Sequence, residues 1–371
     1  MSALHFIVFA ISFLINVSGC FSFYSNFAFG DSIVDAGNNN YLPSLSKADY
    51  SPYGIDFTPS GGKPTGRYTN GFTIVDIVAQ ALGAKALPLP SLFNNATSNA
   101  MHGGINYASG ASGILEATGT LFVARIPLGK QIDRFKQTRA EMVKQMGEHG
   151  VQHLFRKAIF SVTTGSNDII TYYLPNLPFV GNYAVSPTTL QDLMVSNMTS
   201  HLKRLHELGA RKIVVVDIGP LGCIPFVRAI HLLQMGTCHE EMNMLIRGYN
   251  QKLRLAVQRL NQEIGPRSVF VYANSYDVIN GMLQNYRDYG FENVMDPCCG
   301  VSFPPFFCFR VGDVSEISSN ICEDRSKHLF WDSYHPGQAA NFIIAQHMLN
   351  GNESICYPMN VRQLHKYKLP Q

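Results

Sequence analysis

The sequence has few charged residues, and they form no run of one sign. Asp, Glu, Lys and Arg make up 15% of the 371 residues, and the formal net charge is +3. The 29 Lys and Arg residues are scattered, without the basic stripe that binds a nucleic-acid backbone. We therefore expect no nucleic-acid partner. Hydrophobic residues make up 46% of the chain, which indicates a globular protein with a large core.

Long hydrophobic segments are also missing, apart from one at the N-terminus. Residues 6–15 form an apolar run, and the small residues of Val17-Ser18-Gly19-Cys20 suit cleavage. The run is short for a membrane span, which favours a signal peptide over residues 1–22 rather than an anchor. The C-terminus is polar and carries no lipid-anchor signal. We expect a secreted, extracellular protein without a stable membrane anchor.

The eight cysteines show no Cys-x-x-Cys spacing, which argues against a zinc site. Adjacent Cys298 and Cys299 suit two different disulfide partners better than one ion. If Cys20 is removed with the signal peptide, the remaining number is odd, and one thiol stays unpaired. The sequence leaves the disulfide connectivity open.

Three Asn-x-Ser/Thr triplets agree with secretion, because this pattern accepts N-linked glycans in secreted proteins. They begin at Asn95, Asn197 and Asn352. Each triplet arises easily by chance, so the prediction of a glycoprotein rests on their agreement with the signal peptide and the disulfides.

Short apolar runs alternate with longer segments in which apolar residues recur every three or four positions. The runs, predicted as strands, lie at 25–29, 105–108, 158–163, 213–218 and 269–273. The predicted helices lie at 72–82, 129–146, 188–208, 241–263 and 337–349. This alternation predicts an α/β fold with a central parallel sheet that helices cover on both faces.

No linker or internal repeat divides the chain, so we expect a single domain over residues 23–371. Residues 41–70, rich in Pro, Gly and Tyr, are predicted to be a long loop. The cysteine-rich residues 288–330 are predicted to be a second one. Both loops would lie on the surface of the single domain.

Four groups of polar residues or glycines follow predicted strands or precede the last predicted helix. In open α/β sheets, ligands bind beyond the carboxyl ends of the strands. The four groups are Ser32, the segment Gly110-Ala111-Ser112-Gly113, Asn167, and the pair Asp332 and His335, with Pro336 expected at the first position of the last helix. Their side chains would therefore converge on one crevice, although they are far apart in the sequence.

These residues together supply serine acyl-transfer chemistry. Ser32 would be the nucleophile, His335 the base that accepts its proton, and Asp332 the anion that orients the imidazole. An oxyanion would need preorganised donors. We expect these to be the Ser32 N–H, the Asn167 amide and the Gly113 N–H, with the Gly110 N–H as the alternative.

Each signal alone has a simpler explanation. Ser32 could stabilise a turn, and Asp332 could cap a helix. The occurrence of all these signals in one sequence, each next to a strand or helix end, favours a catalytic role. The absence of a Gly-x-Ser-x-Gly motif disfavours the α/β-hydrolase fold, and no cluster of His, Asp and Glu has metal-ligand spacing. We expect neither a metal nor another cofactor.

The same segments resemble the four sequence blocks of the SGNH, or GDSL, hydrolases. The blocks are Gly30-Asp31-Ser32-Ile33, the segment from Asn106 to Gly113, Gly165-Ser166-Asn167-Asp168 and Asp332-Ser333-Tyr334-His335. Asp35-Ala36-Gly37-Asn38-Asn39, Gly66-Arg67-Tyr68-Thr69-Asn70-Gly71 and Cys298-Cys299-Gly300 further resemble the secreted GDSL esterase/lipases of plants. The family name has leucine where this chain has Ile33, an apolar substitution.

The resemblance implies a three-layer α/β/α, flavodoxin-like SGNH-hydrolase fold. It implies hydrolysis of carboxylic esters of lipids, small acyl groups or cell-wall polymers, in the apoplast or cell wall. By motif, Ser32, Asp332 and His335 would form the catalytic triad, and Asn167 and Gly113 would serve the oxyanion hole. An acyltransferase, or a secreted binding glycoprotein that keeps the fold, is the alternative.

Overall fold

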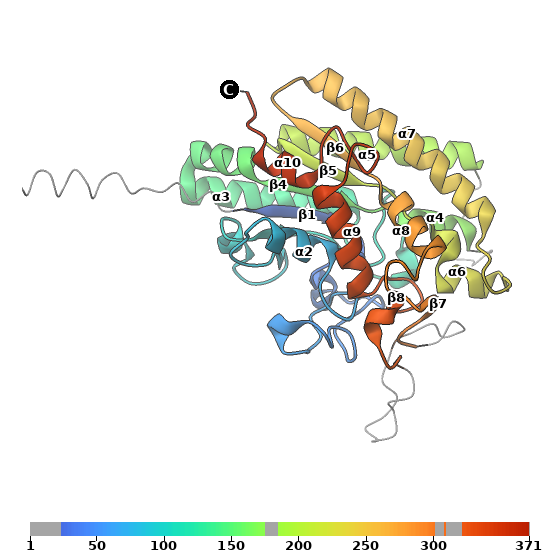
Figure 1. Ribbon diagram of the computed structural model, residues 1–371. Helices are drawn as coiled ribbons and strands as arrows, with labels where there is room; N and C mark the ends of the chain where they lie inside the picture. Colours follow the sequence, from blue (N-terminus) through green and yellow to red (C-terminus); the bar gives the residue numbers. More distant parts are fainter. Residues whose placement is uncertain (1–23, 175–184, 301–307, 309–320, 371) are drawn as a thin grey trace, which may run out of the picture.

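The computed structural model describes residues 24–174, 185–300, 308 and 321–370. The predicted signal peptide, including Cys20, lies outside these residues. Within them, a central sheet lies between two layers of helices (Figure 1). The expected α/β fold is confirmed, and the central sheet, expected to be parallel, is mostly so.

The central sheet has seven strands in the order β2-β3-β1-β4-β5-β6-β9. The strands are β1 (Asn26–Gly30), β2 (Leu89–Pro90), β3 (Gly104–Asn106), β4 (Ile159–Thr163), β5 (Lys212–Val216), β6 (Val269–Ala273) and β9 (Cys356–Tyr357). All neighbours pair in parallel except β6 and β9. β1, β4, β5 and β6 are buried along their whole length, as their apolar runs predict for a sheet covered on both faces.

Two groups of helices cover the sheet (Figure 1). One group contains α3 (Leu128–Lys157), α5 (Pro187–Glu207) and α7 (Glu240–Ile264), and the other contains α2 (Ile74–Ala81), α9 (Gln338–Asn350) and α10 (Val361–Lys366). The shorter helices are α4 (Ser166–Tyr173), α6 (Pro225–Ile230) and α8 (Ser275–Gln284). The five predicted helices are confirmed within a few residues, except that α3 continues past a kink at Gly147, where φ is 73°.

Two details of the sequence prediction are wrong. The second predicted loop contains β7 (Asn293–Pro297) and β8 (His328–Phe330), which pair in parallel as a separate two-stranded sheet. Pro336 does not begin a helix, because it forms a β-bridge with Phe330. Helix α9 begins two residues later, after Gly337. A further helix, α10, follows α9.

The strand order opens a crevice at the end of β1. Strands β3-β1-β4-β5-β6 have the flavodoxin-like order, in which the chain reverses direction across the sheet between the first strand and its neighbour. Ligands bind at this switch point, beyond the carboxyl ends of the strands. Ser32 follows β1 and Asn167 follows β4, so the topology brings both residues to the crevice.

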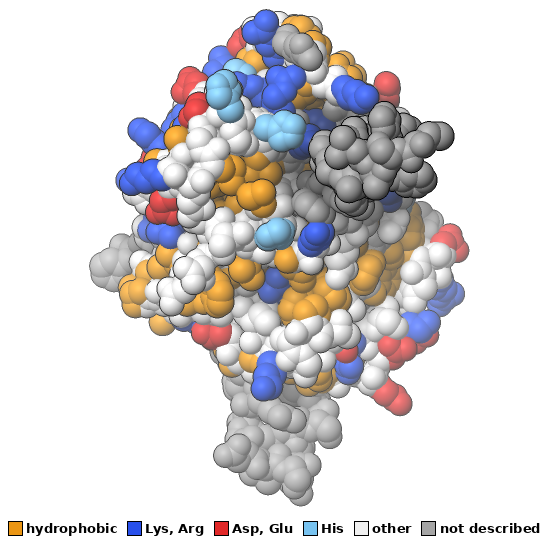
Figure 2. Space-filling model, turned by 90° about the vertical axis from the view of Figure 1, so that its left-hand side faces the viewer, with side chains coloured by type: hydrophobic (Ala, Val, Ile, Leu, Met, Phe, Trp, Pro, Cys, Tyr) orange, Lys and Arg blue, Asp and Glu red, His pale blue; other side chains and the backbone are white. Residues whose placement is uncertain are grey.

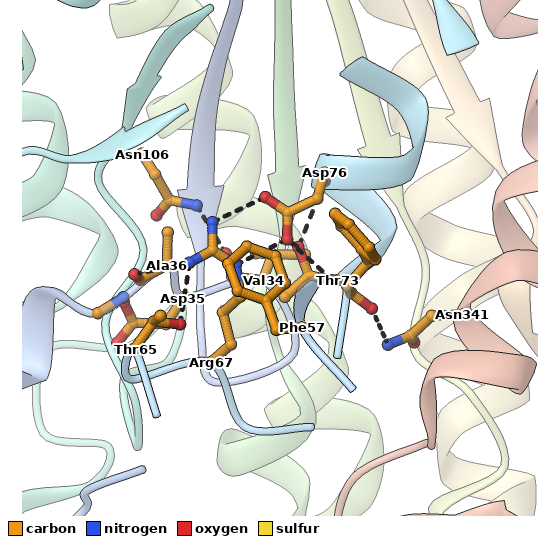
Figure 3. A network of polar contacts seen from close by, with 12 residues as sticks. Val34, Asp35, Ala36, Phe57, Thr65, Arg67, Thr73, Asp76, Asn106 and Asn341 are labelled. Carbon is orange, nitrogen blue, oxygen red and sulfur yellow. Dashed lines mark hydrogen bonds and ion pairs between the residues drawn. The ribbon is translucent and has the colours of Figure 1, made fainter. Parts of the chain in front are cut away.

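The long loop of residues 41–70 is fixed to the domain by a buried ion pair. Arg67 donates two hydrogen bonds to Asp76 in the first turn of α2, at 2.8 and 2.9 Å. Its guanidinium carbon lies 4.4 Å from the centre of the Phe57 ring and a third nitrogen faces the Ala36 carbonyl (Figure 3). Thr73 and Asp76 form a capping box at the same helix end. The interaction joins the loop, the helix and the turn after Ser32.

Figure 2 shows one face of the molecule, on which Lys and Arg side chains are dispersed among acidic, hydrophobic and uncharged ones. Among the helices of the described residues, none is long and apolar enough to cross a membrane.

Replacing Arg67 with methionine should lower the free energy of unfolding by about 3–5 kcal/mol, because it leaves the Asp76 carboxylate buried without its partner. As a control, Lys203→Ala breaks a solvent-exposed ion pair with Glu263 and should cost less than about 1 kcal/mol. Urea denaturation measures both. Equal losses in the two variants would show that the buried pair does not anchor the loop.

Candidate active site

Ser32 lies in a tight turn that is clamped to the end of β1. The side chain of Gln131 from α3 brackets Gly30, accepting from its N–H at 2.9 Å and donating to its carbonyl at 2.8 Å. A Cβ atom on Gly30 would lie 2.1 Å from the Thr163 carbonyl oxygen, so only glycine fits. The Asp31 carboxylate accepts a hydrogen bond from the Ile33 N–H inside the turn. The backbone therefore holds Ser32 at the crevice.

Asp332 and His335 lie in a turn between β8 and α9. The Asp332 carboxylate accepts hydrogen bonds from the N–H groups of Tyr334 and His335, at 2.8 and 2.7 Å. The Trp331 N–H donates to the His335 carbonyl at 2.8 Å and closes the turn. This is a local Asx-type turn, and Asp332 does not cap the following helix.

The three side chains form a continuous hydrogen-bonded chain. His335 Nε2 lies 2.7 Å from Ser32 Oγ, and His335 Nδ1 lies 2.8 Å from Asp332 Oδ2. The exposed fractions are 8% for Ser32, 9% for His335 and 2% for Asp332. A ligand can thus reach the hydroxyl and the ring edge while the carboxylate stays away from water.

The charge of Asp332 is stabilised by its surroundings. Burial would raise the pKa of this carboxyl, but the neighbouring imidazole of His335 and hydrogen bonds from His335, Tyr53 and the Tyr334 N–H lower it below its ordinary value. Asp332 is therefore ionised at neutral pH, and can fix the ring with Nδ1–H toward itself and Nε2 toward Ser32.

Sequence reasoning did not find Tyr53, which is a further member of this hydrogen-bonded chain. Its hydroxyl donates a 2.7 Å hydrogen bond to Asp332 Oδ2. Burial and the charge of Asp332 raise the pKa of Tyr53 well above its ordinary value, so the hydroxyl keeps its proton. Tyr53 packs with Tyr68 and Trp331, and Tyr68 also lies against the His335 ring. The richness of residues 41–70 in tyrosine was the only sequence signal.

Asn167 lies at the start of α4 and its side chain is oriented by a backbone contact. Its Nδ2 donates to the Ser112 carbonyl at 2.9 Å. A side-chain amide has two N–H groups, and in the described part of the chain the second has no acceptor. The neighbouring Asp168 accepts from the N–H groups of Ile114 and Leu115, which fastens this turn to the second sequence block.

The two glycines considered for the oxyanion hole, Gly110 and Gly113, both lie against buried carboxylates. The Gly110 N–H donates to Asp35 Oδ2 at 3.0 Å, and Gly113 packs so closely on Asp168 that a Cβ atom would lie 2.5 Å from its carboxylate. Neither glycine lines the cavity at Ser32. Ala111 does, and it has a left-handed backbone with φ of 63°.

A cavity of about 370 Å³ opens in front of Ser32. Its polar side holds Ser32, Asn167 and His335, together with Ala111. The rest of the lining is mostly apolar and includes Leu121, Phe122, Ile170, Leu174 and Phe226. The site can therefore hold a reactive polar group against Ser32 and an apolar group beside it.

Within the described residues three disulfides are formed, Cys223–Cys238, Cys298–Cys322 and Cys299–Cys308. The expectation that Cys298 and Cys299 have different partners is confirmed. These two residues donate backbone hydrogen bonds to Phe330 and Trp331, directly before Asp332. Cys356 is free, and burial raises the pKa of its thiol to about 12, which keeps it unreactive.

Potential metal ligands come together at one place in the described residues, at Cys298, Cys322 and His328. Because the two cysteines are joined in a disulfide, they offer no thiolate to an ion.

The three glycosylation acceptors differ in access. Asn95 and Asn352 are exposed, whereas Asn197 is half-buried within α5 and donates to the Leu193 carbonyl.

Residues 27–348 match the family described as GDSL-like Lipase/Acylhydrolase. One GDSL esterase/lipase of Arabidopsis thaliana is 52% identical over 344 residues, which cover 92% of this chain and 93% of the relative. A second is 47% identical over 351 residues, covering 93% and 92%. The matched region includes every residue of the hydrogen-bonded chain described above.

Proposed function

The chain belongs to the GDSL-like lipase/acylhydrolase family, and from this premise we propose that it hydrolyses carboxylic esters with Ser32 as nucleophile. The observation that carries the proposal is the unbroken hydrogen-bonded chain from Ser32 through His335 to Asp332. Its members are a nucleophile, a base and an anion in contact, at the mouth of a mostly apolar cavity.

The reaction follows from these contacts. Ser32 Oγ bonds to the ester carbonyl carbon while His335 Nε2 takes the hydroxyl proton, and Asp332 stabilises the imidazolium. The ester C–O bond then breaks, and the proton passes from His335 to the leaving alcohol. Water attacks the acyl-enzyme, gives a proton to His335, and the carboxylic acid leaves as Ser32 regains its proton.

In both steps the carbonyl oxygen of the ester becomes negatively charged, and this oxyanion needs hydrogen-bond donors near Ser32. Two are the Ser32 N–H and the Asn167 side-chain N–H that has no acceptor among the described residues. For the third, we propose the Ala111 N–H in place of Gly113 or Gly110, because Ala111 lines the cavity and neither glycine does, and because the Gly110 N–H already donates to Asp35. The left-handed backbone of Ala111 is a strained conformation of the kind found at functional sites.

The proposed setting is extracellular. The apolar leader, the three disulfides and the exposed acceptors Asn95 and Asn352 all support a secreted glycoprotein. The free thiol of Cys356 is buried, so it adds no exposed reactive group.

Hydrolysis of p-nitrophenyl acetate and butyrate by the secreted protein should fall to the buffer rate in Ser32→Ala, because the variant has no nucleophile. An alkyl fluorophosphonate should label the wild type on the peptide that contains Ser32, as mass spectrometry would detect. A folded, glycosylated protein that neither hydrolyses esters nor takes the label would instead be a binding glycoprotein.

Replacing Asn167 with alanine should lower kcat by about 10²–10³ and leave KM nearly unchanged, because the lost donor acts on charge that develops in the transition state. Steady-state kinetics on p-nitrophenyl butyrate measure this, and an unchanged melting temperature would show that the contact to Ser112 is not the cause. A kcat within about threefold of the wild type would remove Asn167 from the oxyanion hole.

Replacing Tyr53 with phenylalanine should lower kcat/KM about tenfold, since a hydrogen bond to a charged group contributes roughly 1.5–3 kcal/mol. This hydrogen bond lowers the pKa of Asp332, so its loss raises that pKa. The carboxylate of the variant then holds a proton on the neighbouring His335 ring more strongly, and because the protonated ring cannot act as the base, the acidic limb of the pH–rate profile moves to higher pH.

Tyr68→Phe is the matched control for this variant. It removes a hydroxyl from the same aromatic cluster, but that hydroxyl donates to the Ser46 carbonyl and not to Asp332. Its acidic limb should stay at the wild-type position. If both variants shift the limb equally, Tyr53 acts through packing and not as a positioning residue for Asp332.

A further inference from the structure

A second cavity, of about 70 Å³, lies beside the site cavity at the carboxyl ends of β4 and β5. This volume is enough for about two water molecules, each of which takes ~30 Å³ in the liquid. The residues that line both cavities are Ile33, Ser166, Leu221 and Tyr334. Ile33 directly follows Ser32 in the chain, and Tyr334 directly precedes His335. The partition between the cavities therefore includes the immediate neighbours of the proposed nucleophile and base.

The lining of the second cavity contains a buried hydroxyl that needs a partner. The Thr164 side chain is 4% exposed, and its hydroxyl has no hydrogen-bond partner in the described part of the chain. A buried polar group without a hydrogen bond is costly, and buried water molecules commonly supply the missing partner. The hydroxyl of Thr164 thus points to a small polar ligand in this cavity.

Other polar groups in the same lining can hold such a ligand. Asp217 Oδ2 accepts one hydrogen bond, from the Tyr272 hydroxyl at 2.6 Å, and a carboxylate oxygen can accept a second. Ser166 supplies a third polar side chain. A buried water molecule makes about three hydrogen bonds, so Thr164, Asp217 and Ser166 match its needs.

Hydrolysis needs a water molecule while the site cavity is occupied. In the proposed reaction the acyl group stays bonded to Ser32, within a cavity whose lining is mostly apolar. Such a lining offers few hydrogen bonds to hold a water molecule in place. The second cavity offers them, on the other side of a partition that adjoins His335, the group that must accept the proton of the water.

We infer that the second cavity holds the water that attacks the acyl-enzyme, and that Thr164 is its positioning residue. The inference rests on the proposed function and assigns the source of its second reactant. The water passes Ile33 and Tyr334, its oxygen bonds to the acyl carbonyl carbon, and its proton moves to His335 Nε2. The bond from that carbon to Ser32 Oγ then breaks, Ser32 regains the proton, and the carboxylic acid leaves.

Competition between water and an alcohol for the acyl-enzyme tests this assignment. An added alcohol reverses the first step, so it attacks from the position of the leaving alcohol in the site cavity. With p-nitrophenyl butyrate and a fixed concentration of butan-1-ol, Thr164→Val should raise the ratio of butyl butyrate to butyric acid about tenfold, the effect of one lost hydrogen bond. Gas chromatography measures both products, and their ratio does not depend on how much of the variant is folded.

Three further variants keep the test specific. Ile279→Phe narrows the second cavity from α8 without changing Thr164, and it should also raise the ratio. Thr164→Ser keeps the hydroxyl and should keep the wild-type ratio. Thr138→Val should do the same, because the Thr138 hydroxyl donates to the Arg134 carbonyl within α3 and lines neither cavity. A rise in Thr138→Val equal to that in Thr164→Val would overturn the inference.

The decay of the butyryl-enzyme measures the water step alone, without an alcohol. Acid quenching followed by mass spectrometry of the intact protein should show decay about tenfold slower in Thr164→Val than in the wild type. An ester hydrolase in which this decay and the product ratio are unchanged by Thr164→Val takes its water from elsewhere, and the inference alone is wrong. Failure of the proposed function looks different: no product forms above the Ser32→Ala rate, no butyryl-enzyme appears, and the inference falls with it.

Discussion

One buried negative charge, that of Asp332, is the constraint around which the site is built. A carboxylate removed from water is costly unless several donors replace the lost hydration. Here the donors are the His335 ring, two backbone N–H groups of its own turn and the Tyr53 hydroxyl. Each donor comes with a segment of chain that must be held in place, so the charge determines where the turn, the imidazole and the long loop lie.

This requirement explains the layers of support beyond the site. The long loop that carries Tyr53 is anchored through the ion pair of Arg67 and Asp76, and the turn that carries Asp332 is bonded to the backbone of Cys298 and Cys299. Ser32 is held independently by the end of β1 and by Gln131. Ser32 thus belongs to the sheet, whereas Asp332 and His335 belong to loops that are fastened onto it.

Patterns that are local in sequence predicted the fold and most of the candidate site. The buried strands are continuous apolar runs, and Ser32, Asn167 and His335 stand in short motifs next to strand or helix ends. The contact of Tyr53 with Asp332 spans 279 residues and leaves no local pattern, and the disulfide pairing is equally non-local. The position of Pro336 was misjudged because its pairing with Phe330 overrides its preference for a helix start.

Ser32 and His335, the proposed nucleophile and base, are separated by 303 positions in the sequence. A ribosome completes the strand that holds Ser32 near the beginning of synthesis, and adds His335 only near the end. A nascent or prematurely terminated chain therefore has the hydroxyl but no base to activate it. In the proposed mechanism, the order of synthesis therefore keeps the protein inactive toward esters until its last segment has emerged and docked.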